Sequence, residues 1–451
     1  MVTLLFIWFA VGIGLTCIVC RGHKGSAGMP LAYFLALSLI HLPGAILYLD
    51  ADGSNVTTIG FEQTTIGAVA FLVGVIIARY AFVRPLAEQP SAGQTQDFTR
   101  LRVTKLDRLA LVYVLVGSVA FFVLMPLAAS IPSATSLVSP LGSLILVGAC
   151  IRLWVASESR DWLKYWSTMA LLPVLPLATL LQGGFLGFGT GWALAIVTFC
   201  FAQSKRKLIY LLLAPAVFFG GLSIFVNYMA TRGELRQLVW HQQVSIGDRL
   251  SRVADVFRDF EWLDLSNFRH RQAIDDRLNQ NQYIGIAVER LELGAVEYAS
   301  GDTLGKAAIA LIPRLIWPNK PAVGGGGSVV HDFTGIEFAQ GTSIGAGQVF
   351  EFYVNFGSLG VIVGFLLYGL LAGRMDLSVI KYLRQGDQQR LLLWFLPCMA
   401  LLQPGGNLLE IIVGMVSSAI TAYSIGYLLP RDFRRGPTRT RQTALGTVSP
   451  R

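Results

Sequence analysis

Long apolar blocks, separated by short polar segments, set the pattern of this chain. Most blocks approach the roughly 20 apolar residues that a helix needs to cross a bilayer, although the tenth is short and the ninth is long enough to tilt. The eleven blocks are residues 2–20, 30–49, 59–83, 109–129, 136–155, 163–182, 185–203, 208–228, 345–373, 391–403 and 408–429. The pattern predicts an all-α, polytopic integral membrane protein with about eleven transmembrane helices.

One long polar stretch interrupts the pattern between the eighth and ninth blocks. We therefore divide the chain into four regions: eight predicted spans in 1–228, a large loop in 229–344, three further spans in 345–429 and a basic tail in 430–451. Apolar residues recur at helical spacing in two parts of the loop, which predicts amphipathic helices there. Their apolar positions are Leu250, Val253, Phe257 and Phe260 in the first, and Ile284, Val288, Leu291, Ala295 and Tyr298 in the second.

The composition agrees with this pattern. The chain is 53% hydrophobic and 14% charged, with a mean hydropathy of +0.57, whereas a soluble domain is typically about 25% charged. These values exclude an ordinary soluble domain. The first block lacks a basic leading segment and a small-residue cleavage site, so we expect a span there and not a cleaved signal.

Basic residues fall in every second loop. The loops 50–58, 130–135, 183–184 and 404–407 contain no Lys or Arg, whereas the loops between them and the tail are basic. Because basic loops stay on the cytoplasmic side, we predict an outer N-terminus and a cytoplasmic C-terminus. The large loop is then outside, on the periplasmic or extracellular face.

Charge and cysteine content narrow the classes of partner and cofactor. The large loop holds twelve Lys/Arg and fourteen Asp/Glu, so the net charge of +9 arises from the rest of the chain. That surplus indicates attraction to the anionic inner leaflet, so we expect the lipid bilayer as a partner and not nucleic acid. The five cysteines lie in or beside apolar blocks, which predicts buried thiols without a disulfide framework. We expect no metal and no cofactor.

The segment "ALIPRLIWPNKPAVGGGGS" at 310–328 is the most distinctive part of the large loop. Residues before proline favour extended geometry, and a tryptophan suits the membrane–water boundary, so we expect a stiff elbow. Its rigid positions are Pro313, Trp317, Pro318 and Pro321. The elbow would hold Arg314 and Lys320 at headgroup depth, where both can bind phosphate oxygens. An interfacial anchor with snorkelling basic side chains is the alternative.

Four glycines follow the elbow. Gly324 to Gly327 have maximal backbone freedom, so we expect the segment after them to move as a lid. That segment carries His331, Asp332 and Glu337. A lid in this place would close between the elbow and the start of the ninth span.

Two strings, "IPRLIWPNKP" and "GQVFEFYVNFGSLGVIVGFLLYGLLAG", resemble the Wzy-type polymerases of O-antigen and exopolysaccharide repeat units. The similarity covers about residues 285–373. It implies a GT-C-like membrane enzyme that uses undecaprenyl-diphosphate-linked oligosaccharides as donor and acceptor on the periplasmic face, with a flippase and a chain-length regulator as partners. It also implies functional positions at Arg290, Arg314, Lys320 and Glu351.

One departure from that family concerns a phosphate contact. Relatives often carry an arginine in a turn where a span begins near the outer face, but "LLQGGFLGFGTGWAL" at 180–194 has none. We expect Arg232 and Arg236, just after the eighth span, to supply the contact. Helix-end charges on a solvated surface are the alternative for these two residues.

Resemblance and local chemistry together define a candidate site for glycosyl transfer. Arg314 is expected to stabilise the leaving group, and a carboxylate to orient or deprotonate the acceptor. Glu351 is the first candidate for that carboxylate, followed by Glu297 and Asp332. The candidates for binding diphosphate or substrate are Arg232, Arg236, Arg290, Lys320, His331 and Glu410. Glu410 lies about one turn inside the last block, where an ionisable group is functional by default.

Two other functions stay open. An O-antigen ligase-like enzyme would use the same donor chemistry with a different acceptor. A transporter or flippase for the lipid-linked glycan would be expected to show paired repeats and broken helices near the midplane. Among single residues, Asp50 and Asp52 resemble the outer carboxylates of other GT-C enzymes, although an Asp/Gly-rich turn explains them. His41 is interpreted as a polar residue satisfied inside the bundle.

Overall fold

The computed structural model is helical. It describes residues 1–21, 25–51, 53–82, 96–128, 134–183, 187–240, 258, 260–312, 317, 319, 326–338, 345 and 347–429. Within these residues there are α-helices and one π-helical segment, and no β-strand. The prediction of an all-α fold is confirmed for this part of the chain.

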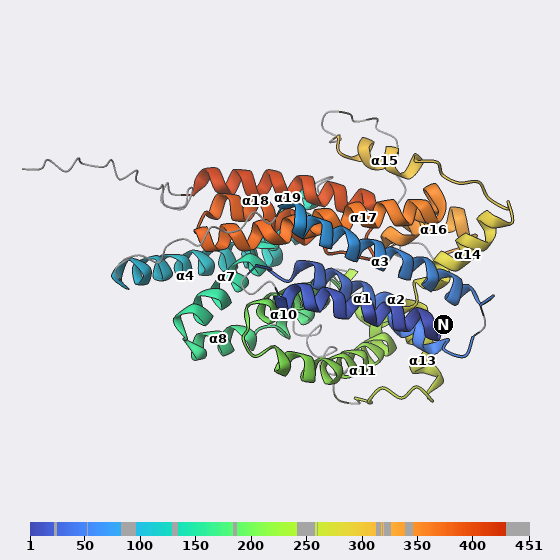
Figure 1. Cartoon of the computed structure of the whole chain (residues 1–451), viewed down its shortest axis with the longest axis horizontal. Coiled ribbons are helices and arrows are strands. Elements are labelled where there is room, and N and C mark those ends of the chain that lie inside the picture. The colour runs from blue at the N-terminus through green and yellow to red at the C-terminus, as the bar shows by residue number, and fades with distance from the viewer. Residues whose placement is uncertain are drawn as a thin grey trace, which may run out of the picture.

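Figure 1 shows the order of the helices along the chain. Those before the large loop are α1 (Val2–Arg21), α2 (Met29–Leu47), α3 (Val56–Phe82), α4 (Gln96–Val119), η1 (Ala120–Leu124), α5 (Met125–Ala128), α6 (Ala134–Gly142), α7 (Leu144–Ser159), α8 (Trp162–Met169), α9 (Val174–Gly183), α10 (Gly187–Gln203) and α11 (Lys207–Trp240). The large loop contributes α13 (Phe268–Leu278), α14 (Asn281–Glu292), α15 (Asp302–Ala310) and α16 (Gly326–Thr334). The last helices are α17 (Gly347–Gln385), α18 (Gln388–Leu401) and α19 (Leu408–Leu428).

Eight of the described helical segments are long and apolar enough to cross a membrane. They are Val2–Cys20, Met29–Leu47, Val56–Phe82, Thr104–Ala128, Ala134–Ser159, Lys207–Gly233, Gly347–Gln385 and Leu408–Leu428. The other three predicted spans are shorter or divided. Apolar Gly189–Gln203 and the 14-residue α18 fall below a full span, and 163–182 is split between α8 and α9. The chain is therefore a membrane-embedded helical protein.

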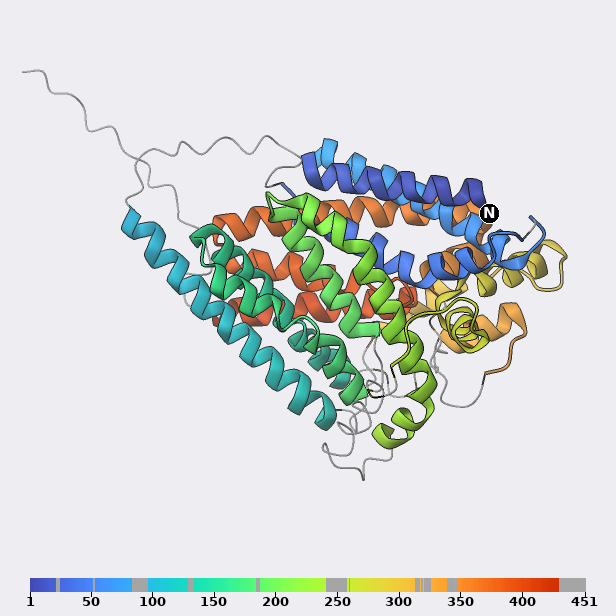
Figure 2. The ribbon, with the colours of Figure 1, turned by 90° about the horizontal axis from the view of Figure 1, so that it is seen from below.

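The helices of the large loop gather at the end of the bundle that holds the N-terminus. Figures 1 and 2 show α13, α14 and α16 at that end, and α19 ends at the opposite end. α13 packs on α2, α14 packs on α3, and α15 packs on α19. We call this the loop end of the bundle.

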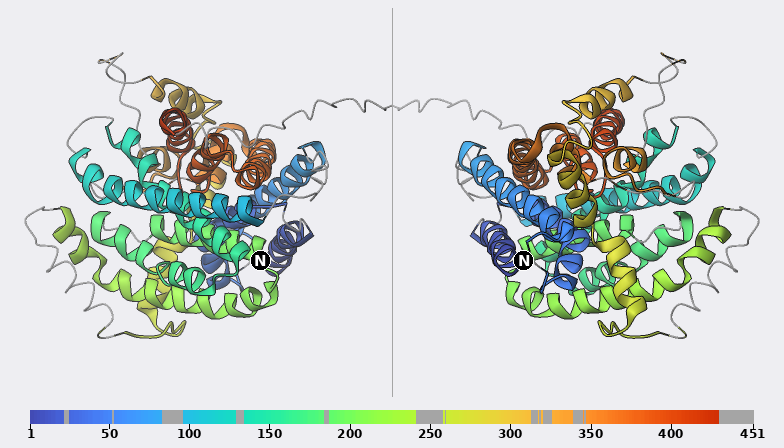
Figure 3. Two further views of the ribbon diagram at one scale, coloured as in Figure 1. Left: turned by 90° about the vertical axis from the view of Figure 1, so that its left-hand side faces the viewer. Right: turned by 90° about the vertical axis from the view of Figure 1, so that its right-hand side faces the viewer.

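The core of the bundle is built around α3 and α17. In the end views of Figure 3, α17–α19 form one side of the molecule and α11 forms the opposite side, with α4 and α7 between them. α3 and α17 approach closely because glycines face each other's backbone: a Cβ at Gly369 would lie 2.1 Å from the Phe71 carbonyl oxygen. Tyr33 of α2 packs against Phe71 and Tyr368, with ring centroids 4.9 and 5.0 Å apart.

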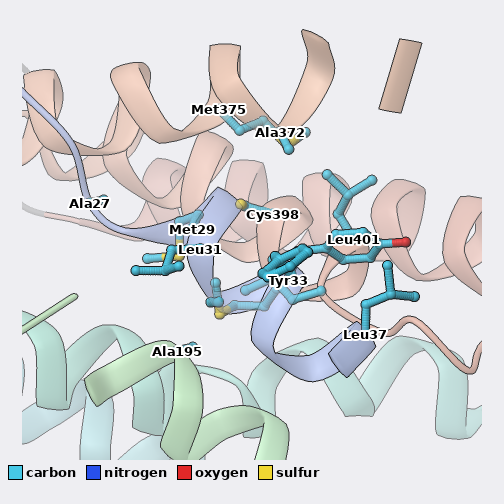
Figure 4. Packing of buried hydrophobic residues seen from close by; sticks show 14 of the residues in the cluster. Ala27, Met29, Leu31, Tyr33, Leu37, Ala195, Ala372, Met375, Cys398 and Leu401 are labelled. Atoms are coloured by element: carbon cyan, nitrogen blue, oxygen red, sulfur yellow. The ribbon is translucent and has the colours of Figure 1, made fainter. Parts of the chain in front are cut away.

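Figure 4 shows the same core from close by. Tyr33 and Leu37 of α2 lie beside Leu401 of α18, and Ala372 and Met375 of α17 lie on the far side of the same cluster. All five side chains are buried inside the protein. This packing holds α2, α17 and α18 together below the loop end.

α17 is broken near its start. Phe356 (φ −142°, ψ 19°) and Gly357 (φ 62°, ψ −156°) leave helical geometry. The Phe352 ring contacts the position of Gly364 and lies 5.8 Å from the Phe365 ring. In a continuous helix Gly364 would lie roughly 18 Å further along the axis than Phe352. Residues 347–355 therefore form a half-helix that runs back alongside 358–366. The prediction of one continuous span over 345–373 was wrong at this point.

Other boundaries also differ from the predicted ones. α11 continues to Trp240, twelve residues past the predicted boundary at 228. The prediction placed the boundary at the end of the apolar stretch, and the helix continues into the more polar residues after it. α14 ends at Glu292, so Ala295 and Tyr298 do not continue its apolar stripe, while Ile284, Val288 and Leu291 are buried as predicted. The predicted helix around 250–257 lies outside the described residues.

Candidate functional site

A small polar pocket lies at the loop end, where α15, α16, the half-helix 347–355 and the start of α19 meet. It encloses about 360 Å³, including space open to solvent. Its lining is Thr303 and Lys306 from α15, Ser328, Val329 and Asp332 from α16, Glu351 from the half-helix, and Asn407 and Leu409 at the start of α19. We call it the carboxylate pocket, because Asp332 and Glu351 both line it.

Asn407 shapes one side of the carboxylate pocket by starting α19. It has extended backbone geometry (φ −72°, ψ 155°) and forms a capping box with Glu410. The Asn407 backbone N–H donates to the Glu410 carboxylate at 3.4 Å. Asn-x-x-Glu is a helix-start pattern because the two side chains satisfy amides that lack a partner within the helix. Glu410, predicted to bind substrate, is thus used as a helix cap and does not line the pocket.

Glu351 lies on the floor of the carboxylate pocket and is 2% exposed. Its carboxylate accepts a hydrogen bond from the Leu408 backbone N–H, the first amide of α19. Its backbone carbonyl accepts a hydrogen bond from Asn355 at 2.7 Å, and Asn355 also donates to Thr303 at 2.6 Å. These bonds join α15, the half-helix and α19 around one small volume.

The pocket floor is recessed below the loop end. Gln348, at the start of the half-helix, donates to the carbonyls of Gln403 and Gly406 at 2.8 and 2.6 Å. Tyr368 donates to the Leu401 carbonyl, and Tyr368 lies eleven residues beyond Gly357 in α17. At 1.5 Å per residue this is roughly 16 Å further along the helix. The connection between α18 and α19 is therefore inside the bundle.

α16 forms another wall of the carboxylate pocket. Val330 and Thr334 are buried on one face of this helix, and Asp332 is exposed in the pocket. Gly326 and Gly327 are in its first turn, so half of the glycine run predicted to be a hinge is helical. Gly324 and Gly325 lie outside the described residues. His331 was predicted to bind substrate, but its Nδ1 lies 3.0 Å from the Ile336 carbonyl and it does not line the pocket.

Lys306 is a pocket residue that the sequence analysis missed. It stands on α15, is 49% exposed and forms an ion pair with Asp302 at 2.6 Å. Lys306 is the one lysine in a mostly apolar stretch over 304–317, so no charge pattern pointed to it. Thr303 and Asn407 were missed for a similar reason, because isolated polar residues carry no pattern.

A pair of arginines lies elsewhere at the loop end. Arg232 near the end of α11 and Arg277 at the end of α13 are both partly buried. Burial, and then the nearby positive charge of Arg232, lowers the pKa of Arg277. The carboxylate of Asp276, the residue before Arg277, shifts this pKa in the opposite direction. Arg277 was not predicted as a site residue.

Three of the remaining candidates do not line the carboxylate pocket. Arg290 packs against Gly335 at the end of α16, where a Cβ would lie 3.1 Å from its Nη1. Glu297 is exposed and does not line the pocket, because α14 ends before it. Trp317 is 40% exposed.

The elbow itself lies outside the part of the chain that the structure describes. This applies to Arg314, Lys320, Pro313, Pro318 and Pro321. Arg236 is in α11, and its side chain also lies outside the described part. The predicted roles of these residues stay predictions.

A buried polar network ties the large loop to the bundle. His41 Nδ1 lies 2.7 Å from Asn281 Oδ1, and Asn281 donates to the His41 carbonyl at 2.8 Å. Asn279 bonds Thr57 and Asp275, and Tyr48 donates to Asp275 at 2.9 Å. The interpretation of His41 as a polar residue satisfied inside the bundle is confirmed. The network fixes α13 and α14 to α2 and α3.

Comparison with known proteins gives a family and no function. No curated protein matches the chain, and no solved structure matches it. The model of a domain of unknown function, DUF8712, matches residues 63–379, which is more than half of the 451 residues. The matched region contains Arg232, Arg277, Asp332 and Glu351 but ends before α19. The chain belongs to the DUF8712 family.

Proposed function

We propose that this protein polymerises undecaprenyl-diphosphate-linked oligosaccharide repeat units into a surface polysaccharide. It acts as a GT-C-like glycosyltransferase on the outer face of the bacterial cytoplasmic membrane, with its N-terminus outside and its C-terminus in the cytoplasm. One observation carries the proposal: an apolar helical bundle has a recessed carboxylate pocket at its loop end, and an arginine pair lies at the same end on the side that α11 forms. An enzyme that joins two lipid-anchored sugars at the membrane surface needs both groups there.

The arginine pair suits the donor's diphosphate. Burial lowers the pKa of the Arg277 guanidinium, and the positive charge of Arg232 lowers it further, so a bound anion beside them would be stabilised. Guanidinium groups also bind phosphate oxygens through two parallel hydrogen bonds. Arg232 and Arg277 therefore hold the diphosphate in this proposal, together with Arg314 and Lys320 of the elbow.

The reaction joins an acceptor sugar to the donor glycan. The acceptor hydroxyl oxygen bonds to the donor's anomeric carbon as the bond from that carbon to the diphosphate oxygen breaks. The hydroxyl proton passes to a carboxylate of the carboxylate pocket. Undecaprenyl diphosphate leaves with both electrons of the broken bond, and the arginines stabilise its developing charge. A flippase that delivers the units and a chain-length regulator are the expected partners.

The experiment uses purified protein in detergent with fluorescent lipid-linked repeat units. We expect a ladder of longer products. Arg232→Ala and Arg277→Ala should each lower the rate by about 100-fold or more, which is the usual cost of losing a preorganised charge at a leaving group. Arg271→Ala is the matched control, because Arg271 is exposed on the same helix as Arg277. A wild-type protein that extends no chain under any condition contradicts the proposal.

Experiments can distinguish the proposed polymerase from two alternatives, a ligase and a transporter. A ligase-like enzyme has the same donor chemistry, but its deletion leaves long lipid-linked chains unattached, whereas loss of a polymerase leaves single repeat units. The break in α17 at Phe356–Gly357 and the recessed start of α19 favour a transporter as the second candidate, because broken helices often line transport sites. Product ladders in detergent, where no compartments exist, rule out pure transport.

A further inference from the structure

The start of α19 has an unusual arrangement of partners. The first amides of any helix lack partners within the helix. Glu410 satisfies the amide of Asn407, and Glu351 satisfies the amide of Leu408 from another helix. A carboxylate next to a helix N-terminus is also favoured by the helix dipole. Glu351 is therefore bound to the backbone of the protein itself.

The two carboxylates of the carboxylate pocket differ in access. Glu351 is 2% exposed on the floor, between Phe350 and Leu408, which are both buried. Asp332 is exposed on the opposite wall, on the helix that covers the pocket. A sugar hydroxyl that arrives from the loop end meets Asp332 first. The Leu408 amide occupies Oε2 of Glu351, so the hydroxyl can reach this carboxylate only through its other oxygen, deeper in the pocket than Asp332.

We propose that Glu351 is a positioning residue, which holds the half-helix 347–355 against the start of α19, and that Asp332 is the carboxylate that contacts the acceptor hydroxyl. The role of Asp332 rests on the proposed function, whereas the positioning role of Glu351 does not. Glu351 acts through Leu408 and Asn407, so its loss shifts the pocket floor. The nearby bonds from Gln348 to Gln403 and Gly406 hold the same junction from below.

The test compares an isosteric variant with a truncation. Glu351→Gln keeps an oxygen that accepts from the Leu408 amide, whereas Glu351→Ala leaves that buried amide without a partner. We expect the unfolding temperature of detergent-solubilised Glu351→Gln to equal that of the wild type, and that of Glu351→Ala to fall by a few degrees. This measurement needs no substrate, so it stands even when the proposed function fails.

Activity then separates the two carboxylates. We expect Glu351→Gln to extend lipid-linked repeat units within about threefold of the wild-type rate and to keep the acidic limb of the pH–rate profile. Asp332→Asn should lose about 100-fold or more with an unchanged unfolding temperature. Glu337→Gln is the matched control, because Glu337 is an exposed carboxylate soon after α16 that does not line the pocket.

Three results overturn the assignment. The first is a stable Glu351→Gln protein that has lost its activity, because Glu351 would then contact the substrate itself. The second is an Asp332→Asn protein with full activity. The third is a Glu351→Gln protein as unstable as Glu351→Ala, which would mean that the hydrogen bond to Leu408 is not what holds the junction. A wild-type protein without activity contradicts the proposed function and leaves the first measurement to decide the role of Glu351.

Discussion

Asn407 shows how one side chain prepares the carboxylate pocket. Its side chain and that of Glu410 close the start of α19, and this fixes the direction in which the helix enters the bundle. The pattern Asn-x-x-Glu is visible in the sequence, but it reads as a helix start and not as a pocket. Asn407 becomes part of a site only because the fold brings it close to Glu351, which is 56 positions away in the chain.

We predict that Asn407→Ala lowers the free energy of unfolding by about 1 kcal/mol, the usual cost of losing an N-cap. Asn407→Ser should retain most of that stability, because a serine oxygen also caps a helix. Thermal unfolding of the purified protein in detergent measures both. Equal stability of the alanine and serine variants would show that the cap contributes nothing here.

Sequence chemistry identified only some of the residues at the site. Glu351 and Asp332 were among the predicted residues, and both line the carboxylate pocket. Lys306 and Arg277 were missed, because each stands in a stretch whose local pattern has a simpler explanation. His331, Glu297 and Glu410 were predicted for contact with substrate, and none of them lines the carboxylate pocket. The His331 ring lies beside the Ile336 carbonyl, Glu297 is exposed and Glu410 caps α19, so their predicted roles stay predictions.

Close helix contacts at the loop end depend on glycines. A Cβ at Gly285 of α14 would lie 1.8 Å from the Val56 carbonyl oxygen at the start of α3, and a Cβ at Gly60 would lie 1.9 Å from the Asn281 carbonyl oxygen. Backbone atoms cannot move aside as a flexible side chain does. α14 is therefore held so near α3 that any larger residue must separate them.

We predict that Gly285→Ala lowers the free energy of unfolding by at least about 1–3 kcal/mol, the usual cost of overpacking. It should also expose the large loop to protease. Gly305→Ala is the control: Gly305 is in α15 with open space around its Cβ position, so alanine should be neutral or slightly stabilising. Limited proteolysis and thermal unfolding are the measurements, and two variants with equal behaviour would contradict the close packing of α14 on α3.

The broken α17 can be tested by cross-linking. Phe352 and Gly364 are in contact across the break, so the pair Phe352→Cys and Gly364→Cys should form a disulfide under mild oxidation. In a continuous helix the two positions would be roughly 18 Å apart, far beyond disulfide reach. Phe352→Cys with Val363→Cys is the control, because Val363 is 47% exposed on another face. Mass spectrometry of the digested protein detects the cross-linked peptides, and equal yields from both pairs would contradict the hairpin.

At the scale of the whole molecule, the arrangement of the ends agrees with the predicted topology. The N-terminus and the helices of the large loop share one end, and α19 runs to the other (Figures 1 and 2). Alternating charge in the loops predicts that the loop end is outside.

We predict that a cysteine at Gly53 reacts with a membrane-impermeant thiol reagent on intact cells, whereas a cysteine at Arg206 reacts only after the membrane is opened. Both positions are exposed; Gly53 follows α2 at the loop end, and Arg206 precedes α11 at the other end. The parent protein with its own cysteines is the control for background labelling. The reverse pattern would place the loop end in the cytoplasm.

Some properties of this protein follow from the sequence alone. Its helical, membrane-embedded class was predictable, because apolar stretches of spanning length are a local property and every backbone amide in lipid must be bonded within its own helix. The place of the large loop along the chain followed from the gap between apolar blocks, and the burial of Ile284, Val288 and Leu291 in α14 followed from their helical spacing. The interpretation of His41 followed from its place inside an apolar block.

Only the tertiary structure decided how α17 begins and what surrounds Glu351. The half-helix 347–355 mixes apolar residues with Gln348, Glu351 and Asn355 and leads directly into a long apolar stretch. Hydropathy could therefore not distinguish a helix that turns back at Gly357 from one that continues. The carboxylate pocket joins residues from 303 to 409, and the arginine pair joins α11 to α13. Such meetings depend on which helices pack together, and close packing is set by contacts between distant glycines and backbone atoms that no local pattern records.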